Sequence, residues 1–413
     1  MITVSEAIEQ ILQTIKPLGL ERINLLDALG RVLGEDVTAG RNIPPKDNSA
    51  MDGYALRFQD TLGASQNNPV VLEVIEDIPA GAIPQKRIAT GQAARIMTGA
   101  PLPEGANAVM KMEETEKAGQ KVKIRAEAQD GQDIRRSGED VRQGELAVPK
   151  GSIVRPAAIG MLASLGRSFI SVYQRPLIAV LATGNELVDI DESPSPWKIV
   201  NSNSYSIASQ ALDCGALVMQ MGIAKDNRED LIAKFQAAMR ADIIISSGGV
   251  SVGDYDLVKD IMQEVGSKMQ FWQVAMRPGK PLAFGRAGNV PMFGLPGNPV
   301  SSMISFEQFI RPAILKMTGH QNIFRKTVVA VLQDDIEKRK GLTYFTRAWV
   351  KVGAGGYTAT TTGEQGSGIL KSMVRANGLI VAPADLEKVG AGTAVRVQLL
   401  DSSLGWTSQP DYL

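Results

Sequence analysis

The sequence predicts a multidomain protein of the α/β plus β class, and three observations support this. The chain has 413 residues, which is too long for one ordinary hydrophobic core and indicates two to four domains. Strand-like and helix-like segments alternate over residues 176–317, as in a doubly wound sheet. Short β-like runs separated by glycine turns occupy residues 70–150 and the chain after residue 319.

The composition places the chain among globular proteins and argues against several classes of function. Apolar residues make up 44% of the chain and charged residues 21%. Lys and Arg together number 44, as do Asp and Glu, so no net charge attracts nucleic acid or a membrane surface. No signal-peptide pattern and no apolar run of membrane-spanning length is visible in the sequence, and we therefore expect a cytoplasmic location.

The chain has one cysteine, Cys214, and one histidine, His320. This count excludes an intrachain disulfide and a zinc site built from Cys and His. We interpret Cys214 as a small buried residue and His320 as a surface residue of a linker. Acid–base chemistry must therefore come mainly from Asp, Glu, Lys, Tyr or bound water.

The N-terminal half combines helical ends with a β-rich middle. Apolar residues at helical spacing predict a helix over 3–15, with Thr3 and Glu6 as a capping box, and a second helical segment over 25–33. The polar segment 41–55 is typical of a binding loop, or equally of a solvated turn. Further on we expect β-like runs at Val70–Ile75, Ala108–Met112 and Lys121–Ile124. Two polar loops are expected at Arg95–Pro101 and Arg135–Asp140, and a helix is expected at Ala157–Leu165.

The α/β domain is expected to bind its ligand beyond the carboxyl ends of its strands. The residues Ile243–Ile245 are typical of a parallel strand that is covered on both faces. Asn227, followed by Glu229 and Asp230, is a good helix start. The predicted strands are 177–182, 216–223, 242–247 and 291–295, and the predicted helices are 203–214, 228–240, 256–265 and 300–317.

A glycine-rich turn follows one of these strands. Gly248, Gly249 and Gly253 allow close approach of the backbone to a ligand, and a helix N-terminus behind them favours an anion. Their spacing resembles a Walker A loop, but Asp254-Tyr255 replaces the Lys-Ser/Thr pair, so this is not a standard NTPase loop. With Asp256 nearby, the turn favours a hydrated cation beside a phosphate. A structural turn with solvated aspartates is the alternative interpretation.

Three other segments carry similar signals. Thr183–Glu186 delivers a glycine and a carboxylate directly after an apolar run. Arg277–Pro281 places two cations around a rigid Pro-Gly turn. Gly294–Val300 opens a long helix, with Asn298 as its cap and Pro299 at its first position. After this domain, five runs predict a small barrel or sandwich, namely Thr327–Leu332, Tyr344–Val352, Tyr357–Thr361, Leu379–Ala382 and Ala394–Leu400.

Taken together, these motifs resemble those of the molybdopterin molybdenumtransferase family, which is called MoeA in bacteria and also matches the C-terminal domain of gephyrin. The matching segments run in order along nearly the whole chain: Asp47–Tyr54 (DNSAMDGY), Arg95–Pro101 (RIMTGAP), Ser137–Asp140 (SGED), Thr183–Leu187 (TGNEL), Ser246–Gly253 (SSGGVSVG), Pro278–Pro281 (PGKP), Gly294–Val300 (GLPGNPV) and Thr360–Ser367 (TTTGEQGS).

The resemblance implies an elongated homodimer of four-domain subunits with an active site shared between the subunits. It places a discontinuous helical domain at 1–22, 44–52 and 140–172, a small β domain at 23–43 and 53–139, a molybdopterin-binding α/β domain at 173–319 and a β barrel at 320–413. The implied reaction inserts molybdenum from molybdate into adenylylated molybdopterin, aided by Mg²⁺, and releases AMP. Contacts with the molybdopterin adenylyltransferase and with acceptor molybdoenzymes are also implied.

The resemblance also assigns roles to individual residues. Glu186, Asp226 and Asp256 are expected to hold the metal or orient water, and Asp52 is expected to act in catalysis from the partner subunit. The expected substrate-binding residues are Thr98, Asp140, Gly248, Gly249, Ser251, Gly253, Arg277, Lys280, Pro296, Pro299 and Ser367. The chain departs from related sequences in having Arg277 and Gln273 where lysines are common, which lowers the positive charge expected at the pterin site by one.

Two rival functions fit part of the same pattern. Molybdopterin adenylyltransferases have a similar α/β domain, but they are usually single domains, and they consume ATP. A scaffold role, as gephyrin adds in animals, requires linkers or partner-binding tails, and none is visible in this sequence. The motif match over the whole chain therefore favours the molybdenum-inserting enzyme.

Overall fold

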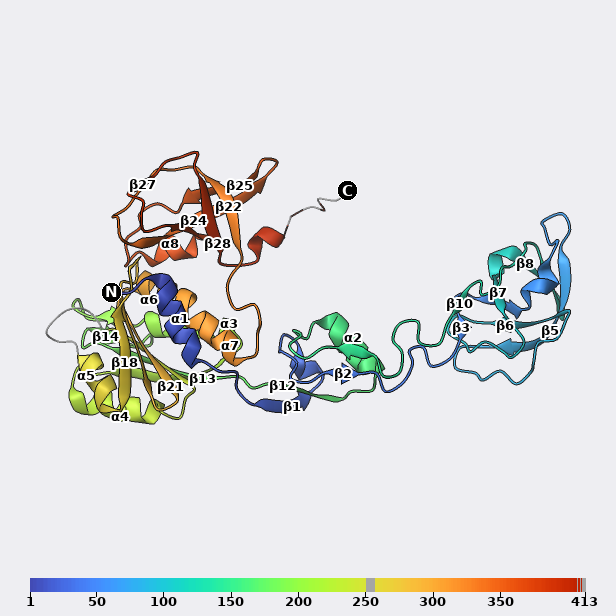
Figure 1. Ribbon diagram of the computed structural model, residues 1–413, viewed down its shortest axis with the longest axis horizontal. Helices are drawn as coiled ribbons and strands as arrows, with labels where there is room; N and C mark the ends of the chain where they lie inside the picture. The colour runs from blue at the N-terminus through green and yellow to red at the C-terminus, as the bar shows by residue number, and fades with distance from the viewer. Residues whose placement is uncertain (250–256, 407, 409, 411–413) are drawn as a thin grey trace. The chain divides into compact units, whose positions relative to one another are not determined.

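The computed structural model describes residues 1–249, 257–406, 408 and 410 (Figure 1). The chain divides into two compact units. The larger unit comprises Met1–Glu21 and Ser171–Leu413, and the smaller unit comprises Arg22–Ile170. Strands β1 (Leu20–Asn24) and β12 (Phe169–Tyr173) lie where the chain passes between the units. Within the described ranges, no helix is both long and apolar enough to cross a membrane.

A six-stranded sheet forms the centre of the larger unit. Its order is β16 (Leu217–Ala224), β13 (Leu177–Thr183), β17 (Ile243–Ser247), β21 (Val290–Leu295), β20 (Pro281–Ala287) and β18 (Ser267–Gln273). The first four strands are parallel, and these are the four that the sequence predicts. The two antiparallel strands, β20 and β18, were not predicted, because β20 begins at a proline and contains Gly285, which weakens its strand pattern.

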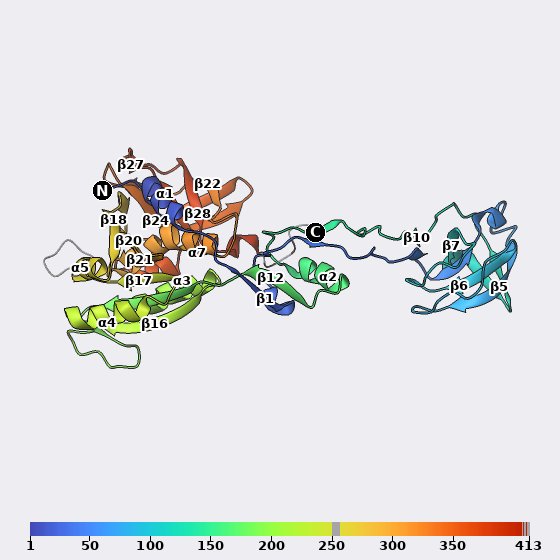
Figure 2. The same ribbon diagram turned by 60° about the horizontal axis from the view of Figure 1, so that its bottom comes forward.

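Alternate side chains of the central strands enter two separate cores, one on each face of the sheet. Ile178 and Ile243 pack with α1, α3, α6 and α7, whereas Ala179 and Ile244 pack with α4 and α5. Figure 2 shows α4 and α1 on different sides of the strands. The doubly wound α/β prediction is therefore confirmed. The helices are α1 (Val4–Thr14), α3 (Asn203–Asp213), α4 (Arg228–Ala238), α5 (Leu257–Glu264), α6 (Pro299–Ser305) and α7 (Arg311–Met317), with a π-helical turn η4 (Phe306–Ile310) between the last two.

Two predicted helix starts are confirmed by their hydrogen bonds, and a third is only partly right. The Thr3–Glu6 capping box is present at α1, and the Asn227 side chain accepts a hydrogen bond from the Asp230 N–H at 2.9 Å. Asn298 occupies the cap position of α6, but in the described part of the chain its side chain makes no capping hydrogen bond. Its amide is thus available to the pocket described below.

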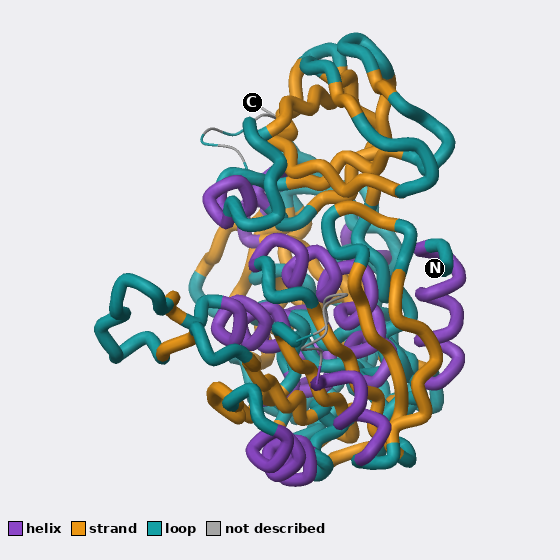
Figure 3. The backbone as a smooth tube through the Cα atoms, turned by 90° about the vertical axis from the view of Figure 1, so that its left-hand side faces the viewer, coloured by secondary structure: helices purple, strands orange, loops and turns teal. Residues whose placement is uncertain are grey.

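A closed five-stranded barrel forms the C-terminal region of the larger unit. Its strands run in the order β24 (Thr343–Gly353), β25 (Gly356–Thr361), β22 (Thr327–Leu332), β28 (Ala394–Leu399) and β26 (Gly378–Ala382), and β26 pairs back to β24. In Figure 3 the strands of this region curve around a common centre. All five predicted strands are therefore confirmed, and closure identifies the barrel rather than the sandwich. The smaller elements are α8 (Leu370–Val374), β23 (Ile336–Glu337), β27 (Lys388–Val389) and η5 (Ser403–Gly405).

The barrel is joined to the central sheet by backbone pairing. The short strand β19 (Met276–Arg277) pairs in parallel with β24, with Arg277 opposite Tyr344. A buried contact between side chains adds to this, since the Gln308 amide nitrogen donates to the Gln398 oxygen at 2.7 Å. The turn that follows Arg277 is therefore fixed against both the sheet and the barrel.

The smaller unit contains a six-stranded sheet of mixed direction. Its order is β7 (Ala108–Lys111), β4 (Gly53–Leu56), β6 (Gln92–Ile96), β5 (Val70–Ile78), β9 (Lys121–Ile124) and β8 (Thr115–Ala118). The small β domain is therefore confirmed as a fold class, although β4 and β6 fall in or beside segments interpreted as loops. The other elements are the pairs β2 (Val37–Thr38) with β11 (Leu146–Val148) and β3 (Asn48–Ser49) with β10 (Ile134–Arg135), the helix α2 (Pro156–Ser164), and the 3₁₀ turns η1 (Leu26–Ala28), η2 (Phe58–Thr61) and η3 (Met112–Glu114).

Two local predictions are wrong. The helix expected over 25–33 is reduced to the three-residue turn η1, because Gly30 adopts φ 78° and its N–H donates to the Val154 carbonyl instead of continuing a helix. His320 is half-buried rather than on the surface, with its Nδ1 2.8 Å from the Thr318 hydroxyl, and burial lowers its pKa. The interpretation of Cys214 is confirmed, since the residue is buried and desolvation raises its thiol pKa to about 12.

A buried ion-pair network joins the helices under the sheet to the segment that leads into the barrel. The Glu307 carboxylate accepts hydrogen bonds from Arg311 Nε at 3.1 Å and from Arg325 Nε at 2.7 Å, and its side chain is 5% exposed. Asp213 contacts the same two arginines, but its side chain is 66% exposed. The two acids therefore share partners and differ in burial.

We predict that Glu307→Ala lowers the free energy of unfolding by about 3–5 kcal/mol, because it leaves two poorly exposed guanidinium groups without their buried carboxylate. The matched variant Asp213→Ala removes a carboxylate that solvent already screens, and should cost no more than about 1 kcal/mol. Urea unfolding followed by circular dichroism measures both values. Equal losses for the two variants would contradict the assignment.

Candidate functional site

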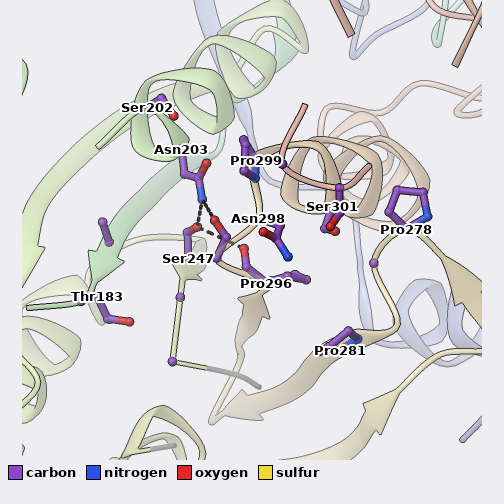
Figure 4. Close-up of a pocket in the computed structure, with 18 of the residues that line it drawn as sticks. Thr183, Ser202, Asn203, Ser247, Pro278, Pro281, Pro296, Asn298, Pro299 and Ser301 are labelled. Atoms are coloured by element: carbon purple, nitrogen blue, oxygen red, sulfur yellow. Dashed lines mark hydrogen bonds between the residues drawn. The ribbon is translucent and has the colours of Figure 1, made fainter. Parts of the chain in front are cut away.

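A pocket of about 950 Å³ lies in the larger unit, beyond the carboxyl ends of β13, β17 and β21 (Figure 4). It opens at the edge of the sheet where the sequence predicts a ligand site. The barrel region closes one side with Arg339, Leu342 and the segment 365–368. Nine of the predicted site residues line this pocket, namely Glu186, Asp226, Gly248, Gly249, Arg277, Lys280, Pro296, Pro299 and Ser367.

The other predicted residues fall into three groups. Ser251, Gly253 and Asp256 lie outside the described residues. Asp52, Thr98 and Asp140 belong to the smaller unit. Gln273, whose replacement of a lysine was expected to affect the site, ends strand β18 and is not a lining residue.

Asn203 joins two of the loops that form the pocket floor. Its Nδ2 donates to the Ser247 hydroxyl at 2.9 Å and to the Gly297 carbonyl at 2.8 Å, so the first residue of α3 links the ends of β17 and β21 (Figure 4). Four further lining residues were not predicted as site residues from the sequence, namely Thr183, Asn203, Asn298 and Arg339. Asn203 could have been found from its place at a predicted helix start after a strand end, but its partners depend on the strand order.

The glycine turn after β17 requires glycine at two positions. Gly248 adopts φ +94°, and a Cβ on it would lie 2.4 Å from the Thr183 carbonyl oxygen. Gly249 adopts φ +63°, and a Cβ there would lie 2.6 Å from Val258 Cγ2. The N–H of Gly248 donates to the Leu295 carbonyl at 3.0 Å, so that group is already bonded and does not bind an anion in this arrangement.

Two carboxylates lie at neighbouring strand ends. Asp226 Oδ2 accepts the Asn185 N–H at 2.9 Å, and Asn185 Oδ1 accepts the Asp226 N–H at 3.2 Å, so the loops after β13 and β16 hold each other. The Glu186 carboxylate lies close to Gly184. A Cβ built on Gly184 would lie 2.6 Å from the Glu186 Oε2 atom. Leu187 of β14 (Leu187–Val188) continues the wall, together with β15 (Ile199–Val200).

These carboxylates fit a hard divalent cation. Among the residues that the structure describes, no group of three Asp, Glu, His or Cys side chains is gathered as a complete metal site. Mg²⁺, however, usually binds through one or two protein carboxylates and completes its shell with water and substrate phosphate oxygens. The oxygen donors of Glu186 and Asp226, which both line the open pocket, match that preference.

Another part of the pocket lining is cationic. Arg277 lies over the Tyr344 ring, 5.5 Å from its centroid, and its Nη1 is 3.3 Å from the phenol oxygen. Burial acts to raise the pKa of Tyr344, but the hydrogen bond from the Arg339 N–H and the charge of Arg277 outweigh it and lower the pKa. Arg277, Lys280 and Arg339 face the pocket, and the carboxylates only partly balance their charge. Such a wall favours an anionic ligand.

A buried arginine holds the barrel loop that lines the pocket. Arg347 is 1% exposed, and its Nη2 donates to the Gly366 carbonyl at 2.9 Å and its Nε to the Ser372 hydroxyl at 3.0 Å. Its backbone N–H also donates to Gln365 Oε1 at 2.9 Å. Desolvation, reinforced by the charge of Arg277, lowers the pKa of Arg347 to about 10. These bonds fix the segment that carries Ser367.

The predicted residues of the smaller unit are also held by hydrogen bonds. Asp52 accepts from the Thr98 N–H at 2.7 Å and from the Thr98 hydroxyl at 2.8 Å, which lowers the pKa of this carboxyl. Asp47 accepts from the Ser137 N–H at 2.8 Å. The Asp140 N–H donates to the Ile43 carbonyl at 3.1 Å. The three polar motifs of this unit are therefore linked to one another or to adjacent backbone.

The fold and the pocket define a multidomain α/β protein with a pocket at its strand ends, lined in part by cationic side chains, and a C-terminal barrel. Three family models match in order: the MoeA N-terminal region (domain I and II) over residues 2–166, a probable molybdopterin binding domain over 179–316, and the MoeA C-terminal region (domain IV) over 329–400.

Relatives match over almost the full chain. Molybdopterin molybdenumtransferase 2 of Mycobacterium tuberculosis is 41% identical over 385 residues, 91% of this chain and 94% of that protein. The molybdopterin molybdenumtransferase of Bacillus subtilis is 36% identical over 409 residues, 98% of this chain and 95% of that protein. The crystal structure of the molybdopterin biosynthesis moeA protein from Pyrococcus horikoshii OT3 has 32% identity and a TM-score of 0.83, covering 97% of this chain and 100% of that one. The chain belongs to the MoeA family.

We predict that Gly248→Ala destabilises the protein by about 1–3 kcal/mol, because alanine is strained at this positive φ and its Cβ would collide with backbone. Gly297→Ala is the matched control, since the nearest atom to a Cβ there is Gly248 Cα at 3.8 Å and no positive φ is required. Its effect should stay within about 0.5 kcal/mol. Thermal unfolding measures both, and a harmless Gly248→Ala would contradict the steric argument.

Proposed function

We propose that this protein inserts molybdenum from molybdate into adenylylated molybdopterin, hydrolysing the adenylate and releasing AMP. The observation that carries the proposal is the pocket at the strand ends, where cationic side chains and two carboxylates line one cavity in a member of the MoeA family. A substrate with a phosphoanhydride is strongly anionic, and it requires positive groups to bind it and hard-metal chemistry to cleave it.

The pocket residues divide between these two tasks in the proposal. Arg277, Lys280 and Arg339 bind the anionic substrate, and the ring of Tyr344 fixes the plane of the Arg277 guanidinium. Glu186 and Asp226 hold Mg²⁺, with Asp256 as a further carboxylate. When bound, the cation neutralises charge on the phosphate groups. Ser367 is assigned to substrate binding because the fixed barrel loop carries it to the pocket wall.

We extend the proposal to the assembly and its surroundings on the strength of the sequence resemblance. The active form is a homodimer in the cytoplasm, and each subunit has the four domains given above. Asp52, Thr98 and Asp140 of one subunit reach the pocket of the other. The dimer receives substrate from the molybdopterin adenylyltransferase and delivers product to acceptor molybdoenzymes.

Incubation with adenylylated molybdopterin, Mg²⁺ and molybdate tests the function directly. AMP release and cofactor formation that need molybdate but no ATP identify the insertion reaction. Consumption of ATP would instead identify an adenylyltransferase. Full activity in excess chelator would remove the Mg²⁺ assignment and leave the insertion reaction standing.

Replacing Glu186 or Asp226 by alanine should reduce AMP release by at least about 10²-fold, the low end for an electrostatic or acid–base group. The thermal midpoint should change little, because both side chains are exposed at the pocket. Asp256→Ala is expected to behave in the same way. Kinetics and thermal unfolding are measured on the same preparations, and a variant that unfolds or turns over normally loses its assigned role.

A mixing experiment tests whether Asp52 acts on the partner subunit's pocket. Asp52→Ala and Glu186→Ala are unfolded and refolded together, so that about half the dimers are mixed. If Asp52 acts across the interface, each mixed dimer has one pocket with both lesions and one with neither, and activity returns to about a quarter of wild type. Activity no higher than that of the separate variants, with subunit exchange shown by a tagged chain, rules out the shared site.

A further inference from the structure

Two buried hydroxyl groups lie beneath the two glycine turns of the pocket. Thr183 at the end of β13 is 3% exposed, and Ser305 at the end of α6 is fully buried. Among the residues that the structure describes, neither the Thr183 nor the Ser305 hydroxyl oxygen has a hydrogen-bond partner. Buried polar groups are normally paired, so two unpaired hydroxyls around one pocket call for an explanation.

Each hydroxyl occupies the space that a side chain on the turn would fill. A Cβ on Gly249 would lie 2.9 Å from the Thr183 oxygen, and a Cβ on Gly248 would lie 3.0 Å from it. A Cβ on Gly279, which has φ +97°, would lie 2.6 Å from the Ser305 oxygen. The two turns, 248–249 and 278–280, both line the pocket (Figure 4). Each hydroxyl therefore lies on the side of the glycine Cα where a side chain would point, in two turns that line the pocket.

The arrangement has an energetic consequence. A buried hydroxyl without a partner loses its hydrogen bonds to water and gains none from the protein, which destabilises this position of the turn. A shift of the turn can bring a backbone group or a ligand oxygen within reach of the hydroxyl. Any ligand that draws the turn forward then gains that hydrogen bond in addition to its own contacts.

We propose that Thr183 and Ser305 are positioning residues, whose unpaired hydroxyls disfavour the ligand-free position of the two glycine turns and become paired when an anionic, phosphate-bearing ligand binds. The inference rests on the proposed function in that the ligand is adenylylated molybdopterin. Neither residue is assigned a chemical step. Their effect is on affinity, because they change the balance between two positions of the turns.

The test compares Thr183→Val and Ser305→Ala with Ser302→Ala. Ser302 is also fully buried on α6, but its hydroxyl donates to the Pro296 carbonyl and to the Asn298 carbonyl. Without ligand, the first two variants should each raise the Tm by about 2–4 °C, since each removes an unpaired buried group. The Ser302 variant should lower the Tm, because it removes a paired hydroxyl.

Kinetics distinguish positioning from simple packing. Thr183→Val and Ser305→Ala should raise the KM for adenylylated molybdopterin about tenfold with kcat unchanged, and Thr183→Ser should restore the wild-type KM. A lower ligand-free Tm in both variants, or an unchanged KM, overturns the inference. A wild-type protein that releases no AMP contradicts the proposed function instead. The affinity of the same variants for inorganic pyrophosphate then decides the inference, with a tenfold loss supporting it and no loss overturning it.

Discussion

The burial of β17 on both faces is the constraint on which the rest of the larger unit depends. Its apolar side chains alternate between two cores, so helices must cover both faces of the sheet, and its neighbours must be parallel strands that return through those helices. Parallel strands end at one edge. The loops after β13, β17 and β21 therefore converge, and the pocket forms where they meet. Polar residues are tolerated at that edge because the residues that follow each strand lie outside the hydrophobic core.

The sequence predicted the elements whose patterns are strong, and it failed where local and tertiary signals disagree. The four parallel strands are apolar runs followed by glycines or polar residues, and the barrel strands are short β-like runs with glycine turns between them, so both groups were recognisable. Strand β4 was not, because Gly53 and the polar residues before it have loop character, and the strand is fixed by pairing with β6 and β7 on either side. The segment 25–33 has helical spacing, but Leu26 and Leu29 are exposed, and its backbone bonds to residues 152–154 instead.

The candidate site was predictable in its motifs and not in its contacts. Glycines, carboxylates and cations at strand ends were visible as residue types, and six of them line one pocket, namely Glu186, Asp226, Gly248, Gly249, Arg277 and Lys280. The partners of Asn203 could not be assigned, because its hydrogen bonds join segments that are 44 and 94 residues away in the sequence. The sequence also predicted that the backbone N–H groups of the glycine turn bind an anion. The Gly248 N–H instead donates to the Leu295 carbonyl of β21. Local sequence specifies which groups are present, whereas strand order decides which of them remain free.

The pairing of β19 with β24 has a consequence for how this protein can vary in evolution. Because Arg277 lies opposite Tyr344 in that pairing and also over its ring, the turn that lines the pocket and strand β24 of the barrel share one register. A barrel acquired from a distant homologue by recombination would shift the Arg277 guanidinium unless it preserved both the register and the aromatic ring. Insertions are therefore tolerated better in the 353–356 hairpin at the far end of β24, where Gly353 pairs with Gly356, than in the residues leading up to Tyr344. The barrel and the pocket are thus expected to change together.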